Sequence, residues 1–269
     1  MRLALIQHIA SGDEQANIRR ALSSVREAAE AGAQVIAFPE LAFTQFFPQK
    51  RLGSGDRFAH SHEVPGPLVQ QFQDLARELG VVLVLNLFER DGKKTFDSSP
   101  VIDADGTLLG CTRMMHITHY EGFWEQDYYD PGDSGAPVYE TAFGRIGVAI
   151  CYDRHYPEYM RSLALAGADV IIIPQAGAAG EWPEGLFEAE MRVAAFHNGF
   201  YTALANRVGE EEVLTFGGGS FVCDPFGQVV ARAPESMEAV LHADIDMDRC
   251  AESSARQLFL QHRRPDQYS

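Results

Sequence analysis

The 269-residue chain is predicted to fold as one α/β domain, because short apolar runs alternate with segments that carry apolar residues at helical spacing. A second observation is internal similarity: residues 31–40 resemble residues 166–175, with a helix end, a strand and a proline in the same register. In addition, no linker or low-complexity stretch divides the chain. These observations predict two similar halves that share a core and a cleft. Chance similarity between two ordinary units is the alternative.

The first half contains three predicted strands and two predicted helices. Residues 1–7, 35–38 and 81–88 form apolar runs of strand length, and the third is apolar enough to be covered on both faces. A capping segment at residues 11–14 precedes a helix that ends at Gly32, and a second helix ends at Gly80. The helical stripes consist of Ile18, Leu22, Val25 and Ala29, then Leu68, Phe72, Leu75 and Leu79. Asp91-Gly92 and Asp105-Gly106 are hairpin signals.

The second half repeats this alternation and ends in an irregular tail. A strand over residues 145–150 leads to Cys151, Pro157 opens a helix, and Gly167 is its expected C-cap. Further strands are predicted at 170–173, 201–205, 221–223 and 239–245, with a helix over 183–200 that places Phe187, Met191, Ala194 and Asn198 on one side. The last twenty residues, about 250–269, have no clear core pattern, so they form either an arm that packs on a partner subunit or a frayed tail.

Composition excludes several classes of function. The net charge of -16 argues against nucleic acid and anionic membranes as partners. The four cysteines are far apart, which predicts neither a disulfide framework nor a zinc site and favours a reduced cytoplasm. No apolar run reaches membrane-spanning length.

Two residues at predicted strand ends could carry out chemistry. Cys151 lies on a strand-to-helix turn, where an α/β fold exposes a nucleophile near free backbone N–H groups. The alternative is an inert buried cysteine. Glu40 directly follows the strand over residues 35–38, either as a solvated charge or as a base that accepts the thiol proton.

Three segments carry a resemblance to the nitrilase superfamily of carbon–nitrogen hydrolases, and shorter matches extend it in order along the whole chain. The three are Phe38-Pro39-Glu40-Leu41, then Arg113 with Met115-His116-Ile117, and Ile150-Cys151-Tyr152-Asp153 with Pro157-Glu158. The shorter matches are Gly122-Phe123-Trp124-Glu125, Pro131-Gly132-Asp133, Ala205-Asn206-Arg207-Val208-Gly209, Phe216 with Gly218 and Ser220, Pro225 with Gly227, and Arg263-Arg264-Pro265.

The resemblance implies a four-layer αββα sandwich and hydrolysis of a small linear amide or N-carbamoyl compound, as in the amidase and N-carbamoyl hydrolase branches. It implies Glu40 as general base, Cys151 as nucleophile, Glu125 as a second glutamate that positions substrate, and the Tyr152 N–H in the oxyanion hole. The reaction would release ammonia and leave a thioester on Cys151, with no metal or organic cofactor. It also implies a homodimer or higher homo-oligomer, with contacts from the helices after Cys151 and from the C-terminal arm.

Four further residues are candidates for substrate binding. Phe123 and Trp124, beside Glu125, could form a pocket wall, although core or rim packing is the commoner role of such residues. Arg154 could meet a substrate carboxylate, or form an ordinary salt bridge with Asp153 or Glu158. Gln175 occupies the position that corresponds to Glu40 in the internal similarity.

Met114 departs from the superfamily pattern, which has the catalytic lysine at this position. Methionine has neither the charge nor the hydrogen-bond donor of lysine, and the loss of one oxyanion donor costs about 10²–10³ in rate. Arg113 should point to the opposite face of its strand, and the three lysines (Lys50, Lys93 and Lys94) lie in distant segments. The methionine is best explained as an introduced substitution that inactivates the enzyme. A natural pseudoenzyme that binds an amide-like ligand, or slow catalysis without the lysine, are the alternatives.

Two weaker patterns are discounted. His60-x-His62 and His116-x-x-His119 lack a third metal ligand at suitable spacing. Asp153 and His155 are too close to Cys151 in sequence to build a protease-like triad with it.

Overall fold

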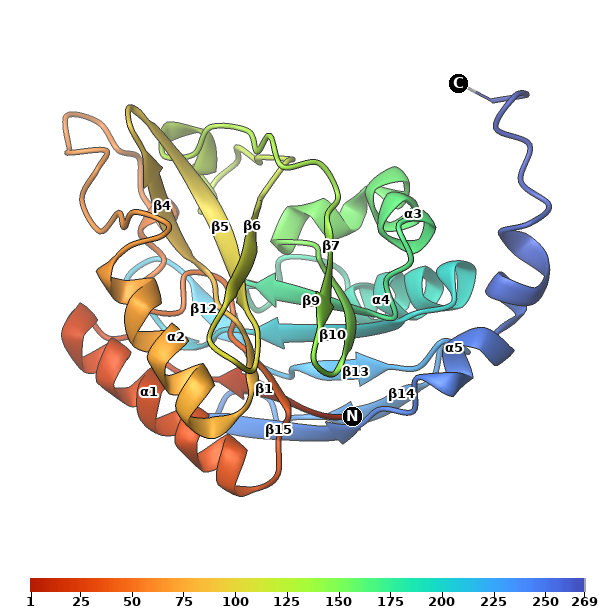
Figure 1. Ribbon diagram of the computed structural model, residues 1–269. Coiled ribbons are helices and arrows are strands. Elements are labelled where there is room, and N and C mark those ends of the chain that lie inside the picture. The colour runs from red at the N-terminus through yellow and green to blue at the C-terminus, as the bar shows by residue number, and fades with distance from the viewer. Residues whose placement is uncertain (269) are drawn as a thin grey trace.

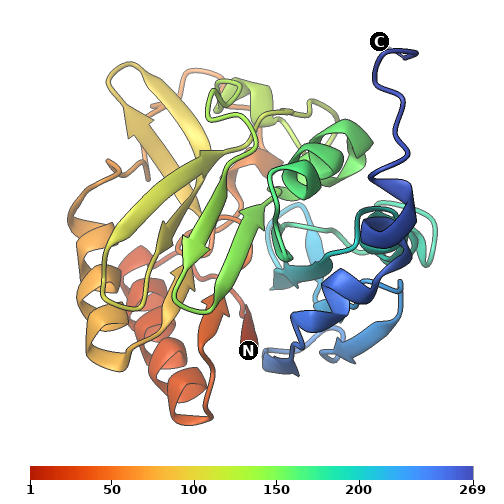
Figure 2. The same ribbon diagram turned by 45° about the vertical axis from the view of Figure 1, so that its right-hand side comes forward.

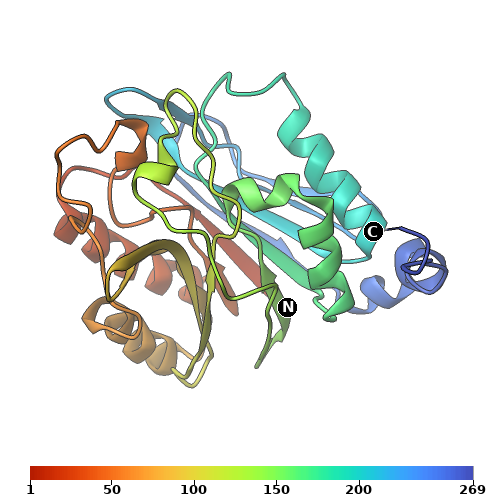
Figure 3. The same ribbon diagram turned by 90° about the horizontal axis from the view of Figure 1, so that it is seen from above.

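Two β-sheets pack face to face and are covered on their outer sides by helices (Figure 1, Figure 3). The computed structural model describes residues 1–268. Helices α1 (Glu14–Glu30) and α2 (Pro67–Leu79) cover the first sheet, and α3 (Pro157–Leu165) and α4 (Leu186–Asn198) cover the second. The predicted αββα sandwich is therefore confirmed.

The first sheet has the strand order β15-β1-β2-β3-β5-β4, and β6 also pairs with β5. Strands β1, β2 and β3 run parallel, while β15, β5, β4 and β6 are antiparallel to their neighbours. The bounds are β1 (Arg2–Gln7), β2 (Val35–Ala37), β3 (Val82–Val84), β4 (Leu87–Asp91), β5 (Lys94–Ile102), β6 (Leu108–Arg113) and β15 (Ala239–Asp244).

The second sheet has the order β14-β13-β10-β9-β8-β7, with β8, β9 and β10 parallel. Its strands are β7 (Val138–Thr141), β8 (Gly144–Val148), β9 (Val170–Gln175), β10 (Tyr201–Asn206), β13 (Phe221–Cys223) and β14 (Val229–Arg232). A separate ribbon pairs β11 (Val208–Glu210) with β12 (Thr215–Gly217). Both sheets thus contain a parallel βαβαβ unit flanked by antiparallel strands, which is the structural basis of the similarity between residues 31–40 and 166–175.

Side-chain alternation along the strands explains the layers. In β1, Leu3 and Leu5 lie in the core between the sheets, whereas Ala4 and Ile6 pack against the helices. In β9, Val170 and Ile172 face the inter-sheet core, and the residues between them face α3 and α4. Because successive side chains point to opposite faces, a strand buried on both faces must be apolar throughout, as these are.

Local signals explain most helix ends. The side chain of Asp13 accepts a hydrogen bond from the Ala16 N–H (3.0 Å) and caps α1, as the acidic segment before it predicts. Pro157 occupies the first turn of α3, and Gly80 ends α2 at a φ of 66°. Helix α4 begins at Leu186 instead of residue 183, after Gly185 at a φ of 80°.

Two other expectations need correction. The apolar run 81–88 is not one strand: β3 ends at Val84 and β4 begins at Leu87, with Asn86 in the break between them. Both strands pair with β5, but only β3 also pairs with β2, so β4 lies at the end of the strand order. The start of the C-terminal segment is not free of the core either. Helix α5 (Asp248–Glu252) and the turn Ala255–Phe259 follow, with Cys250, Ser253 and Ala255 buried, and the chain is largely exposed only from residue 257 onward (Figure 2).

None of the helices within residues 1–268 combines the length and apolar character needed to cross a lipid bilayer.

Candidate active site

Glu40 lies just beyond β2, in a turn held by two long-range contacts. The next residue, Leu41, has a φ of 45°, and its N–H donates to the Asn86 side chain at 2.6 Å. The guanidinium of Arg207 donates to the carbonyl oxygens of Glu40 (2.9 Å) and Leu41 (2.6 Å). Glu40 itself has no solvent exposure, so the expectation of a solvated strand-end charge is excluded.

Cys151 begins a short helical turn, Cys151–His155, between β8 and α3. Its φ of 44° is unusual for a residue with a side chain, and strained backbone of this kind is concentrated at functional sites. The Arg154 side chain donates to the Cys151 carbonyl oxygen at 3.0 Å, and the Gln175 amide donates to the Cys151 sulfur at 3.3 Å. This strand-to-turn geometry presents the thiol just beyond the carboxyl end of β8 in the second sheet.

The structure brings together the three ionisable side chains that the sequence singled out. One side-chain oxygen of Glu40, one of Glu125 and the sulfur of Cys151 all lie within 4.8 Å of one another. Glu125, on the short turn Glu125–Asp127, is fully buried, and Cys151 is 5% exposed. Within residues 1–268, none of the four carboxylate oxygens of the two glutamates has a hydrogen-bond partner.

Met114 follows β6 and is fully buried in the same inter-sheet core as Cys151. Its N–H donates to the Asp97 carbonyl oxygen at 2.8 Å, and its own carbonyl accepts from the Gly132 N–H at 2.8 Å. A Cβ at residue 132 would lie only 2.3 Å from the Arg113 carbonyl oxygen, so this approach requires glycine. The backbone at position 114 is therefore firmly placed.

Within residues 1–268, the ion pairs of Arg113 are all with carboxylates outside the cluster of Glu40, Glu125 and Cys151. Its side chain lies over the Phe96 ring and pairs with Glu89 (2.6 Å), Asp91 (3.0 Å) and Asp133 (3.0 Å), away from Cys151. The predicted opposite orientation of residues 113 and 114 is therefore confirmed. All three lysines are exposed, and no ion pair to Glu40 or Glu125 occurs in residues 1–268.

Burial and neighbouring carboxyl groups together raise the pKa values of these three groups and favour their protonated forms. Burial, and then the charge of Glu125, raises the pKa of Glu40 from 4.5 to about 8. Burial first and the charge of Asp97 second raise the pKa of Glu125 well above its usual range. Burial, followed by the charges of Glu40 and Glu125, likewise raises the pKa of the Cys151 thiol. At neutral pH, Glu40 is therefore mostly neutral and Cys151 is a thiol.

The raised pKa of Glu40 makes stability depend on pH. The folded state holds this proton up to about pH 8 and the unfolded state releases it near 4.5, so the stabilising contribution is complete below 4.5. It is lost as the pH rises towards 8, at up to about 1.4 kcal/mol per pH unit. We expect the free energy of unfolding in urea to fall across this window, and Glu40→Gln to flatten the decline. A Glu40→Gln slope equal to the original would contradict the assignment.

Sequence reasoning missed three buried polar residues around the site. The Asn86 side chain, which receives the Leu41 N–H, also donates to Asp97 at 2.6 Å, so one amide links both segments. Burial and the charge of Glu40 raise the pKa of Asp97. Tyr129 is buried with an unpartnered hydroxyl. A polar Asn86 interrupting the apolar run 81–88 was the one available signal.

Gln175 and Arg154, two of the candidates for substrate binding, contact different atoms of Cys151. Gln175 contacts the sulfur directly. Arg154 packs over Phe187 and pairs with Glu190 at 3.3 Å, not with Asp153 or Glu158 as expected. The reason is that its buried side chain is directed towards α4, whereas Asp153 is paired with His116 at 2.7 Å.

The aromatic candidates lie at the edge of the site. Phe123 is buried against Phe46, and Trp124 lies between His119 and the guanidinium of Arg51. These contacts correspond to packing and rim positions. The Tyr152 ring contacts His155 and Tyr156, and its backbone directly follows the thiol.

The weaker patterns have structural explanations. His60 and His62 both contact Glu14, at 3.5 and 2.7 Å. His155 pairs with Glu190 at 2.5 Å. These histidines therefore make carboxylate contacts, and His155 is not paired with Cys151.

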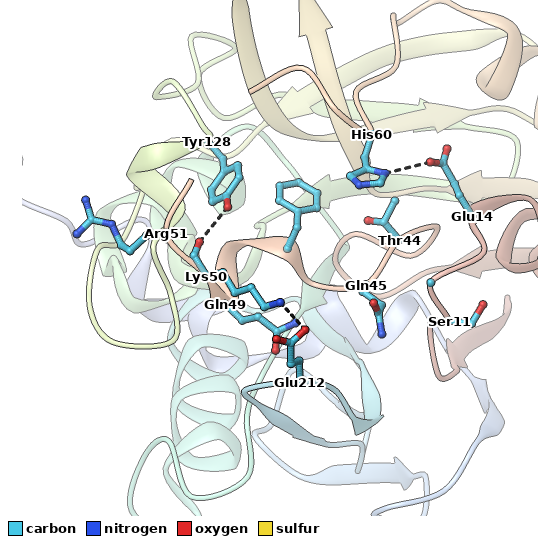
Figure 4. Close-up of a pocket in the computed structure, with 12 residues that line it drawn as sticks. Ser11, Glu14, Thr44, Gln45, Gln49, Lys50, Arg51, His60, Tyr128 and Glu212 are labelled. Carbon is cyan, nitrogen blue, oxygen red and sulfur yellow. Dashed lines mark hydrogen bonds and ion pairs between the residues drawn. The ribbon is translucent and has the colours of Figure 1, made fainter. Parts of the chain in front are cut away.

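Two hollows are prominent on the molecule. The larger, of about 540 Å³, is lined by residues from Gln175 to Glu188 and by parts of β10, β12 and β13. The smaller, of about 330 Å³, is lined by residues 44–51 together with Glu14, His60 and Glu212 (Figure 4). Only the larger includes a candidate site residue, Gln175, which contacts Cys151.

A buried cysteine lies beside two carboxylates where the ends of β2 and β8 meet, an arrangement that suits a thiol-dependent hydrolase. The carbon–nitrogen hydrolase family model matches residues 2–255. N-carbamoylputrescine amidase from Solanum lycopersicum is 35% identical, over 99% of this chain and 93% of its own length. The chain belongs to the carbon–nitrogen hydrolase family, within the nitrilase superfamily, and is an amidase-type hydrolase of non-peptide carbon–nitrogen bonds.

Solved structures agree with this assignment. A carbon–nitrogen hydrolase from Helicobacter pylori G27 superposes with a TM-score of 0.89 at 30% identity, covering 99% of this chain and 96% of that one. A mutant amidase from Nesterenkonia sp. AN1 has a TM-score of 0.83 at 26% identity, with coverages of 99% and 95%. In that structure, the acetamide moiety of fluoroacetamide is covalently attached to the active-site cysteine.

Proposed function

We propose that this chain binds a small linear amide or N-carbamoyl compound and forms a thioester through Cys151, at a rate strongly reduced by Met114. The observation that carries the proposal is the convergence of the Cys151 sulfur with Glu40 and Glu125 within 4.8 Å. The similarity to N-carbamoylputrescine amidase supports this substrate class.

In the proposed reaction, the Cys151 sulfur attacks the amide carbonyl carbon while Glu40 accepts the thiol proton. The Tyr152 N–H stabilises the developing oxyanion, and Glu125 positions the substrate amide. Glu40 returns the proton to the leaving nitrogen, so ammonia departs and a thioester remains. Glu40 then takes a proton from the water that attacks the thioester carbonyl carbon. As the carbon–sulfur bond breaks, Glu40 gives this proton to the departing sulfur, so that the acid is released and the free thiol is restored. An N-carbamoyl substrate would release ammonia and then a carbamic acid by the same steps, and the carbamic acid would break down to an amine and CO₂.

Met114 interferes with the first of these steps. A base must be ionised to accept a proton, and burial together with the charge of Glu125 raises the pKa of Glu40 to about 8. Met114 has no charge with which to lower that pKa. A single introduced substitution in an otherwise intact enzyme explains this site best. The same charge imbalance favours the second candidate, a natural pseudoenzyme that holds an amide-like ligand without turnover.

Intact-protein mass spectrometry tests the proposal. After incubation with acetamide, propionamide or an N-carbamoyl amine in the presence of EDTA, we expect slow mass increases equal to each acyl group. Cys151→Ala should abolish the adduct, because the thioester needs the sulfur. Cys111→Ala should leave it unchanged, because Cys111 lies on β6 beside Glu89 and outside the site. An adduct that persists in Cys151→Ala would overturn the proposal.

We also propose a homodimer. Helices α3 and α4 and the turn Ala255–Phe259 each carry exposed apolar side chains, and the ring centroids of Phe196 on α4 and Phe259 lie 5.5 Å apart. The exposed members are Leu165, Val193, Phe196, Leu258 and Phe259. Exposed apolar side chains on these elements support a subunit interface. All four cysteines are free, which supports the proposed cytoplasmic location.

A further inference from the structure

The cluster of Cys151, Glu40 and Glu125 has the composition of a cation site. It offers one sulfur and four carboxylate oxygens, and none of these oxygens has a hydrogen-bond partner in residues 1–268. Buried carboxylates without partners are costly, and proteins satisfy them with protons, hydrogen-bond donors or cations. In the superfamily pattern a lysine at position 114 supplies a cation, whereas Met114 supplies none.

We propose that Cys151, Glu40 and Glu125 bind a thiophilic divalent cation of the zinc class, which provides the positive charge that Met114 lacks. This inference shares one assumption with the proposed function, namely that position 114 corresponds to the catalytic lysine of the superfamily. It adds a ligand that the amidase reaction itself does not use.

The donor set selects the class of ion. Thiolate together with carboxylate suits zinc and similar borderline-soft ions, whereas magnesium and calcium prefer oxygen donors alone. Tetrahedral zinc, with bonds of about 2.0–2.3 Å, places its donor atoms roughly 3.3–3.8 Å apart. The three donor atoms already lie within 4.8 Å of one another, so movements of about 1 Å are sufficient.

Gln175 offers a fourth donor. Its amide nitrogen lies 3.3 Å from the Cys151 sulfur, and its buried oxygen has no hydrogen-bond partner. Rotation of the amide by half a turn exchanges oxygen and nitrogen with little change in shape. That rotation would turn the carbonyl oxygen towards an ion bound to the sulfur and complete four-coordination.

Binding involves no oxidation or reduction. The metal–sulfur bond forms as the S–H bond breaks, and the thiol proton passes to solvent. The carboxyl groups likewise lose their protons as they coordinate. A sulfur bound in this way no longer attacks a carbonyl carbon, so the ion would inhibit thioester formation.

Cobalt(II) absorption tests the inference directly, without any amide present. We expect the metal-free full-length chain to take up one Co²⁺ with a thiolate-to-cobalt charge-transfer band, and one equivalent of Zn²⁺ to remove that band. Cys151→Ser should eliminate the band. Glu40→Gln should weaken Zn²⁺ binding, measured by calorimetry, by more than about 100-fold. A residue that only contacts a metal ligand would cost less than this when replaced. Cys111→Ala is the matched control and should retain both signals.

Met114→Lys provides the decisive comparison, because the lysine ammonium would supply the positive charge at the site in place of the metal ion. It should lose Zn²⁺ binding while keeping its circular dichroism spectrum. Absence of the thiolate band in the unmodified chain, or equal Zn²⁺ affinity in Met114→Lys, would overturn the inference. The acylation experiment is run with EDTA and reads a different signal, so either proposal can fail without the other.

Discussion

Met114→Lys is expected to raise the rate of ammonia release from a small amide by at least about 10²–10³-fold, equivalent to roughly 2.7–4 kcal/mol of transition-state stabilisation. The new ammonium would enter a fully buried position in the core that also contains Cys151. It would lower the pKa of Glu40 from about 8, so that the base is ionised at neutral pH, and it would also donate to the oxyanion.

Met114→Leu is the matched control, because it keeps an apolar side chain of similar volume and adds no charge. Ammonia release should stay at the level of the unmodified chain. If Met114→Lys folds normally and releases no more ammonia than Met114→Leu, the chain is a binding protein and the impaired-amidase proposal is wrong. Steady-state ammonia assays across several amides would distinguish these outcomes.

Arg207→Met is expected to lower the free energy of unfolding by about 3–5 kcal/mol. Arg207 is 2% exposed, and its guanidinium pairs with the buried Glu211 and donates to the carbonyl oxygens of Glu40, Leu41 and Thr44. Its removal would leave a buried carboxylate without its cation and three carbonyl oxygens without this donor. The measurement is a urea transition monitored by tryptophan fluorescence.

The control for this prediction is Arg26→Met. Arg26 also pairs with a glutamate, Glu78, but both side chains are about half exposed, so the pair should contribute little. A loss in Arg207→Met no larger than that in Arg26→Met would show that the Arg207 contacts do not hold the Glu40 turn.

The features that the sequence predicted well depend on local patterns. Apolar runs before Pro39 and Pro174 locate β2 and β9, although β9 continues through Pro174 to Gln175. The turn at Cys151 is located by the apolar strand before it and by Pro157, which opens α3. The resemblance then placed Glu125 beside them, although no local pattern indicates that position.

The features that were missed depend on contacts between distant segments. Asn86 breaks the run 81–88 because its amide serves both Leu41 and Asp97. Arg154 pairs with Glu190, a residue on α4 that no nearby spacing indicates. Partners of this kind are fixed by how the sheets and helices pack, which a pattern along one segment does not encode.

The two sheets contribute opposite members of the reactive group, since Glu40 follows β2 in the first sheet and Cys151 follows β8 in the second. Neither half therefore holds a working thiol–carboxylate pair until the sheets have docked. Docking near neutral pH must also draw protons out of solution, because the closing interface neutralises carboxyl groups that an open chain leaves ionised. In this chain, assembly of the reactive centre is itself a proton-consuming event.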